Sequence, residues 1–118
     1  MLLRNRYEFS AAHHLERHDG ACRRLHGHNY TVEVTVQGPI DDHSGMVMDF
    51  AVLDRIVREQ ALDHLDHRDL NELIEIPTAE NIARWVWARL APTLGGLFEI
   101  RVYEIPTSAV IYRGEHES

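Results

Sequence analysis

Imidazole side chains are concentrated early in the chain, at spacings that suit a metal ion. Nine histidines occur in 118 residues, and His26 and His28 are separated by a single glycine. Residues two apart on a β-strand point to the same side, so both imidazoles can reach one ion. His13 lies on the apolar face of a neighbouring predicted strand and is the natural third ligand. A catalytic zinc usually has three protein ligands and an open fourth position.

The alternative for any His-x-His pair is two unconnected surface residues. Here all three imidazoles share the parity of the apolar residues on their strands, and an unpaired imidazole facing a core costs desolvation free energy that a metal removes. We therefore predict Zn²⁺ on His13, His26 and His28. His-x-His also occurs in barrel hydrolases, but such a barrel needs about 250 residues, and this chain is too short.

Cys22 is the only cysteine and lies four residues before His26. A lone cysteine is most often a small buried hydrophobe. Here the adjacent Arg23 and Arg24, together with a nearby cation, favour the reactive thiolate, so we interpret Cys22 as a functional group. In the alternative, Cys22 is the fourth ligand of a closed zinc site in a non-enzymatic binding module. A disulfide within the chain is excluded, which agrees with a reducing compartment.

Two carboxylate positions are further candidates for chemistry. Glu104 continues the apolar parity of its predicted strand, where a ligand with several N–H donors would satisfy it; otherwise it is an edge residue beyond the strand end. A carboxylate beside an imidazole can relay protons, and the chain offers such a pair twice, as Asp63 with His64 and as Asp66 with His67. The residues alone do not choose between these pairs.

Hydrophobic periodicity predicts the elements that position these groups. Asp49 and Thr78 are the predicted N-caps of the two helices. The predicted elements are strands at 3–13, 28–37, 98–103 and 109–112, and helices at 49–65 and from 78 to Pro92. The order ββααββ predicts an α+β fold, with a four-stranded antiparallel sheet and two helices packed on one face, in a single domain spanning 1–118.

Composition narrows the classes of partner. The net charge of −7 argues against nucleic-acid binding through a broad basic face. The apolar share of 44% is ordinary for a soluble protein, no apolar run matches a membrane span, and the N-terminal apolar stretch is too short for a secretory signal. We therefore expect a cytoplasmic protein that binds neither membranes nor nucleic acid. Every basic residue is an arginine, which excludes Schiff-base chemistry by lysine.

Several motifs occur in a specific order along nearly the whole chain. They are FSAAHHL (9–15), CRRLHGHNY (22–30), GMVMDF (45–50), LDHRDLN (65–71), PTAEN (77–81) and the strand residue Glu104. In combination they resemble the 6-pyruvoyl-tetrahydropterin synthase family, which includes bacterial 6-carboxy-tetrahydropterin synthase of queuosine biosynthesis. The pattern Cys-x-x-x-His-Gly-His with an upstream Ala-Ala-His carries most of the specificity.

The resemblance implies a role for each candidate residue. It implies a zinc ion on the three histidines, Cys22 as general base, and the second acidic pair, Asp66 with His67, as the relay for proton donation. It also implies that Glu104 anchors the pterin ring through the ring's N–H donors and that Thr78 lies near the pterin pocket. The implied fold is the tunnelling fold, in which trimers close their sheets into a barrel and two trimers commonly stack into a hexamer.

The implied substrate is 7,8-dihydroneopterin triphosphate, whose side-chain hydroxyls would bind the open zinc position. The 6-carboxy branch of the family cuts the side chain and gives 6-carboxy-5,6,7,8-tetrahydropterin, acetaldehyde and triphosphate. The 6-pyruvoyl branch releases triphosphate only. The short chain matches the compact bacterial form and favours the 6-carboxy reaction, although no single residue separates the two products.

Overall fold

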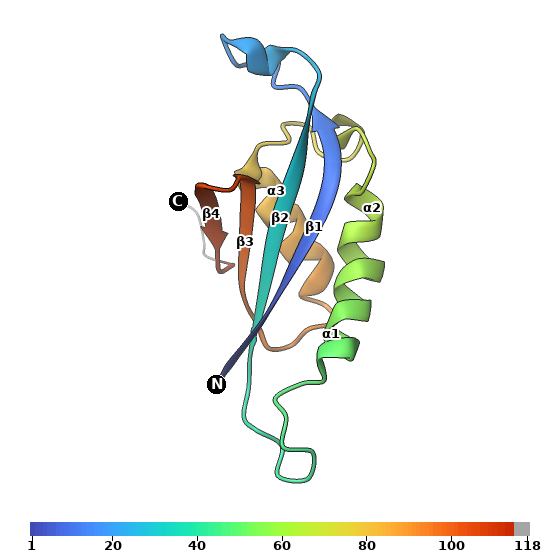
Figure 1. The fold of residues 1–118 in the computed structure, drawn as a ribbon, viewed down its shortest axis with the longest axis vertical. Helices are drawn as coiled ribbons and strands as arrows, with labels where there is room; N and C mark the ends of the chain where they lie inside the picture. The colour runs from blue at the N-terminus through green and yellow to red at the C-terminus, as the bar shows by residue number, and fades with distance from the viewer. Residues whose placement is uncertain (115–118) are drawn as a thin grey trace.

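A four-stranded antiparallel sheet forms one layer of the molecule and the main helices form the other. In the computed structural model, which describes residues 1–114, the sheet order is β1-β2-β3-β4. The strands are β1 (Leu2–His13), β2 (His26–Gln37), β3 (Leu97–Ile105) and β4 (Ser108–Tyr112). Figure 1 shows the helices on one face of this sheet. The predicted α+β fold, with strands and main helices in the order ββααββ, is confirmed.

The helical layer contains one interrupted helix and one continuous helix. The first consists of α1 (Phe50–Val57), a π-helical segment η2 (Arg58–Leu62) and α2 (Asp63–Leu65). The second is α3 (Ala79–Leu90), and two 3₁₀ turns are η1 (Ala21–Arg23) and η3 (Leu70–Glu72). No helix within residues 1–114 is long and apolar enough to cross a membrane.

Both predicted helix N-caps are confirmed by their hydrogen bonds. The Asp49 carboxylate accepts from the Ala51 N–H at 2.8 Å, and the Thr78 hydroxyl accepts from the Asn81 N–H at 3.2 Å. Each cap satisfies one of the N–H groups that a helix start leaves unpaired. The π-helical segment was not predicted, because its residues keep ordinary helical periodicity.

The pairing of β1 with β2 decides where the histidines lie. The register runs without interruption from Leu2 opposite Gln37 to His13 opposite His26. Tyr7 and Phe9 on β1 and Tyr30 on β2 are buried against the helical layer, and His13 is buried on the same face. The ladder therefore ends with two imidazoles directly opposite each other, at the end of the sheet from which the β1–β2 connection projects (Figure 1).

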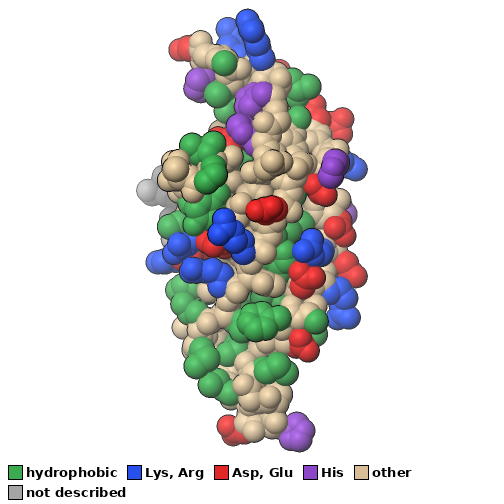
Figure 2. All heavy atoms as spheres, in the orientation of Figure 1, with side chains coloured by type: hydrophobic (Ala, Val, Ile, Leu, Met, Phe, Trp, Pro, Cys, Tyr) green, Lys and Arg blue, Asp and Glu red, His purple; other side chains and the backbone are tan. Residues whose placement is uncertain are grey.

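The other face of the sheet carries charged side chains, which Figure 2 shows gathered over its middle. Glu99 on this face is only 2% exposed, because Arg4, Arg101 and Arg113 donate to its carboxylate. Burial alone would raise the pKa of Glu99, but the hydrogen bonds from Arg101 and Arg113 outweigh it and hold the pKa below its usual value. This network ties β1 and Arg113, the residue that follows β4, to β3 on the face opposite the helical layer.

Candidate metal centre

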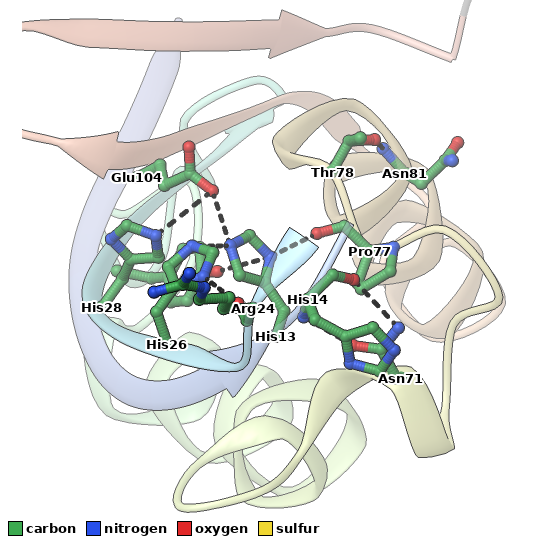
Figure 3. A network of polar contacts seen from close by, with 11 residues as sticks. His13, His14, Arg24, His26, His28, Asn71, Pro77, Thr78, Asn81 and Glu104 are labelled. Carbon is green, nitrogen blue, oxygen red and sulfur yellow. Dashed lines mark hydrogen bonds and ion pairs between the residues drawn. The ribbon is translucent and has the colours of Figure 1, made fainter. Parts of the chain in front are cut away.

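Three imidazoles from two strands converge at the end of the sheet. The ligand atoms of His13, His26 and His28 all lie within 4.8 Å of one another, and no other group of this kind occurs among residues 1–114. The ring centroid of His13 lies 4.6 Å from that of His26 and 5.0 Å from that of His28. The three predicted ligands therefore come together, and their arrangement could hold a metal ion (Figure 3).

The outward ring nitrogens of two of these histidines are held by backbone carbonyls. His13 Nδ1 donates to the Pro77 carbonyl at 2.7 Å, and His26 Nδ1 donates to the Arg24 carbonyl at 2.7 Å. A carbonyl oxygen can only accept, so both hydrogens lie on Nδ1. Both Nε2 atoms then present lone pairs toward the centre of the cluster. Metal-bound histidines are commonly fixed in this way by a partner behind the ring.

The Nε2 atoms of His13 and His26 face each other across a short distance. His13 Nε2 lies 3.0 Å from His26 Nε2, and Glu104 Oε1 lies 3.2 Å from His13 Nε2. Two neutral imidazole lone pairs and a carboxylate oxygen have no hydrogen to share among them when both Nδ1 atoms carry the protons. An ion that accepts electron pairs would satisfy the facing imidazole nitrogens, so the three-histidine donor set fits a metal.

His28 and Glu104 complete the inner surface of the cluster. His28 Nε2 lies 3.7 Å from Glu104 Oε1. Burial lowers the pKa of His28, and this outweighs the opposing effect of the Glu104 carboxylate, so the neutral ligand form is favoured. Glu104 lies within β3, just past the last residue that pairs with β2 and at the register shift against β4. Its side chain is about one third exposed and points to the imidazoles (Figure 3).

Cys22 is not part of the cluster formed by His13, His26 and His28, which we call the metal group. It lies in η1 on the β1–β2 connection and is partly exposed, and its carbonyl accepts from the Leu15 N–H at 2.6 Å. Its sulfur is not among the atoms that meet within 4.8 Å in the described part of the chain. A closed site of Cys22 and three imidazoles is therefore not assembled in this structure.

The second acidic pair is the one that makes a carboxylate–imidazole contact. Asp66 Oδ1 lies 3.0 Å from His67 Nδ1 and also accepts from the Ser10 N–H at 3.0 Å. This backbone hydrogen bond is the main reason why the pKa of Asp66 is lowered. His64 instead contacts the Glu59 carbonyl and the Arg89 guanidinium. His67 adopts a φ of 59°, an uncommon left-handed conformation for a non-glycine residue.

His67 and His28 border the same hollow, although they are on different elements. This hollow, of about 510 Å³, lies at the end of β1 and β2 and is lined by small residues that include Ala12 and Gly27. The imidazole of His67 is 82% exposed, so most of its surface faces away from its own chain.

Sequence reasoning missed Ser10, whose backbone N–H orients the Asp66 carboxylate. Every residue except proline has a backbone N–H, so the residue type does not identify a backbone donor.

Thr78 follows Pro77, whose carbonyl contacts His13 of the three-histidine cluster. Its hydroxyl caps α3, and the carbonyl of the preceding Pro77 holds His13. The cap thus helps to fix the backbone that orients a metal-facing imidazole. A place for Thr78 in a pterin pocket stays a prediction.

The fold and the cluster together define a small α+β chain with a three-histidine group at the end of its sheet. The chain belongs to the 6-pyruvoyl tetrahydropterin synthase family, whose sequence profile matches residues 2–115. It is therefore an enzyme of the tetrahydropterin synthase class.

Individual relatives support this assignment over most of the chain. The chain is 42% identical to the 6-carboxy-5,6,7,8-tetrahydropterin synthase of Synechocystis sp., over 90% of this chain and 88% of that protein. It is 34% identical to the 6-pyruvoyl tetrahydrobiopterin synthase of Dictyostelium discoideum, over 98% of this chain and 97% of that protein. The solved structure of Caenorhabditis elegans 6-pyruvoyl tetrahydropterin synthase matches with a TM-score of 0.88 at 30% identity, covering 98% of this chain and 96% of that chain.

Proposed function

We propose that this chain is a zinc-dependent lyase that converts 7,8-dihydroneopterin triphosphate to 6-carboxy-5,6,7,8-tetrahydropterin, acetaldehyde and triphosphate. This reaction belongs to queuosine and 7-deazapurine biosynthesis. The observation that carries the proposal is the set of imidazole lone pairs that converge beside the Glu104 carboxylate. The similarity to the Synechocystis enzyme over 90% of the chain supports the 6-carboxy branch.

The three histidines are the proposed zinc ligands. These three imidazoles, from two neighbouring strands, would hold the ion, and three protein ligands are the usual number in a catalytic zinc site. A bound zinc ion supplies Lewis-acid polarisation of the substrate's side-chain oxygens, which acidifies the neighbouring C–H bonds. The Pro77 and Arg24 carbonyls keep His13 and His26 in the tautomer that such binding needs.

The remaining candidates divide the work of proton transfer and orientation. Cys22 is the proposed general base that removes a proton from the substrate side chain. The Asp66–His67 pair donates a proton, with the carboxylate held by Ser10 and the imidazole held by the carboxylate. In the 6-pyruvoyl alternative the same groups act and only triphosphate leaves.

The decisive experiment identifies the products. Purified zinc-loaded protein is incubated with 7,8-dihydroneopterin triphosphate, and the products are analysed by mass spectrometry with a separate assay for acetaldehyde. We expect 6-carboxy-5,6,7,8-tetrahydropterin together with acetaldehyde. Release of triphosphate without acetaldehyde would assign the chain to the 6-pyruvoyl branch, and an unchanged substrate would contradict the proposed activity.

We expect the protein to assemble into trimers or hexamers. Within residues 1–114, the outer strands β1 and β4 each leave one edge without a strand partner in the sheet, and such edges are normally covered or paired. Closure of three sheets into a barrel would pair them. The measured mass in solution should be three or six times 13.7 kDa by light scattering. A fully active monomer at micromolar concentration would contradict this assembly.

Replacing Glu104 by glutamine should weaken pterin binding without removing zinc. A carboxylate accepts two N–H bonds from the edge of a pterin ring, whereas glutamine turns one acceptor into a donor. Such a mismatch costs about 1–3 kcal/mol, which is a roughly 5- to 150-fold loss of affinity. Titration with sepiapterin measures the change. Glu33→Gln, on the opposite face of the sheet, is the matched control; equal affinity for wild type and Glu104→Gln would exclude Glu104 as the anchor.

A further inference from the structure

The proposed substrate has its parts in a fixed order, and the site offers groups in the same order. In 7,8-dihydroneopterin triphosphate the ring is at one end, the hydroxyl-bearing side chain follows, and the triphosphate is at the far end. The Glu104 carboxylate meets the inward nitrogens of His13 and His28, whereas the backbone carbonyl of Arg24 meets the outward Nδ1 of His26. Figure 3 shows Glu104 and Arg24 on opposite sides of the three imidazoles. A chain that starts at Glu104 and crosses the imidazoles therefore continues toward Arg24.

The segment that carries Arg24 is an ordered connection. Leu15 N–H donates to the Cys22 carbonyl at 2.6 Å, and this bond joins the two limbs of the connection. The turn η1 is closed by the Arg24 N–H, which donates to the Ala21 carbonyl at 3.0 Å. Because the Arg24 carbonyl also holds His26, the backbone at residue 24 has a fixed position relative to the metal-facing nitrogen.

The two arginines of this segment carry charges that nothing in the described chain neutralises. Arg23 and Arg24 are exposed, and within residues 1–114 neither guanidinium has a hydrogen-bond or ion-pair partner. They border a hollow of about 620 Å³ together with Asp19, Gly20 and Ala21. Figure 2 shows basic side chains at the tip of this projecting connection, next to the histidines.

We propose that Arg23 and Arg24 bind the triphosphate end of the substrate, and this assignment rests on the proposed function. A triphosphate is strongly anionic, and a chain with a net charge of −7 can hold it only where cations are locally in excess. Guanidinium groups are suited to this role, because their paired N–H donors match two phosphate oxygens. The other concentration of arginines, around Glu99, already donates to a buried carboxylate.

Asp19 places a negative charge beside the positive charges of Arg23 and Arg24. Its carboxylate borders the same hollow and repels a phosphate group placed there. Removing this charge by Asp19→Asn should therefore strengthen anion binding, whereas removing the two positive charges should weaken it. A segment that acted only through its backbone would not respond in both directions.

The first test measures anion binding without any catalysis. Metal-free protein is titrated calorimetrically with inorganic tripolyphosphate at low ionic strength, so that chelation of zinc plays no part. We expect the double variant Arg23→Gln/Arg24→Gln to bind about 10- to 100-fold more weakly than wild type. Asp19→Asn should bind more tightly, and Arg55→Gln, an exposed arginine of α1, should match wild type. Equal affinity of the double variant and wild type would overturn the proposal.

The second test separates this inference from the proposed function. Zinc-loaded enzyme is assayed with 7,8-dihydroneopterin triphosphate, and binding of the phosphate-free 7,8-dihydroneopterin is measured in parallel. We expect the double variant to raise KM about 10- to 100-fold while its affinity for 7,8-dihydroneopterin stays unchanged. An active wild type with the same KM in the double variant refutes the arginine assignment alone. An inactive wild type that still binds tripolyphosphate through these arginines refutes the activity and leaves the anion site standing.

Discussion

Substitution of His28 by alanine is expected to remove bound zinc and turnover together. His28 supplies one of three nitrogens that lie within 4.8 Å of one another, and two ligands make an incomplete catalytic shell. Loss of a partner behind a metal ligand already costs about 10- to 100-fold in affinity, and loss of the ligand itself should cost more. Elemental analysis of the purified variant measures the zinc content, and the turnover assay follows on the same sample.

The neighbouring His14 provides a matched control for this substitution. Its ring contacts the Glu16 carboxylate and lies outside the metal group. His14→Ala should therefore retain one zinc per chain and stay folded. Full zinc occupancy in His28→Ala would show that other residues bind the metal.

The substitution Cys22→Ala is expected to keep zinc and fold while losing most turnover. Cys22 is assigned to proton removal, and its sulfur does not belong to the metal group. A positioned acid or base typically contributes about 10²- to 10⁴-fold to a rate, so a loss of this size is expected. Single-turnover kinetics measures it, because this method isolates the chemical step from product release.

Metal content decides between the enzyme and a zinc-stabilised binding module. The wild type and Cys22→Ala are compared by elemental analysis and by circular dichroism. Equal zinc and equal spectra are expected for the enzyme. Loss of zinc and unfolding of Cys22→Ala would support the closed four-ligand site instead.

The fold and the convergence of the three histidines could be predicted because both depend on periodicity. Alternation along two strands placed His13, His26 and His28 on one face, and adjacent strands of a hairpin brought them together. The same reasoning placed Asp49 and Thr78 at helix starts, since capping depends on local residue type. These features need no knowledge of distant contacts.

Other features depend on tertiary contacts that a residue pattern does not record. The carbonyls of Pro77 and Arg24 orient two imidazoles, but every residue has a carbonyl, so neither could be singled out. The choice between the two acidic pairs depends on the Ser10 N–H, which reaches Asp66 from β1. Alternation also put Phe98 with the apolar residues of β3, yet it lies at a register shift and contacts Arg113.

The strand register described above decides whether the three imidazoles meet. His13 and His26 are partners in the last rung of the β1–β2 ladder, so a slip of one residue would turn one imidazole to the opposite face. A slip of two residues in one direction would set His13 opposite His28 and keep all three rings on one face, whereas a slip of two in the other direction would move His13 about 7 Å along the strand from His26. A metal ion bound to the three imidazoles would therefore stabilise registers that keep them on one face over hairpins slipped by one residue. Metal added during refolding would thus favour correct strand alignment over a one-residue slip.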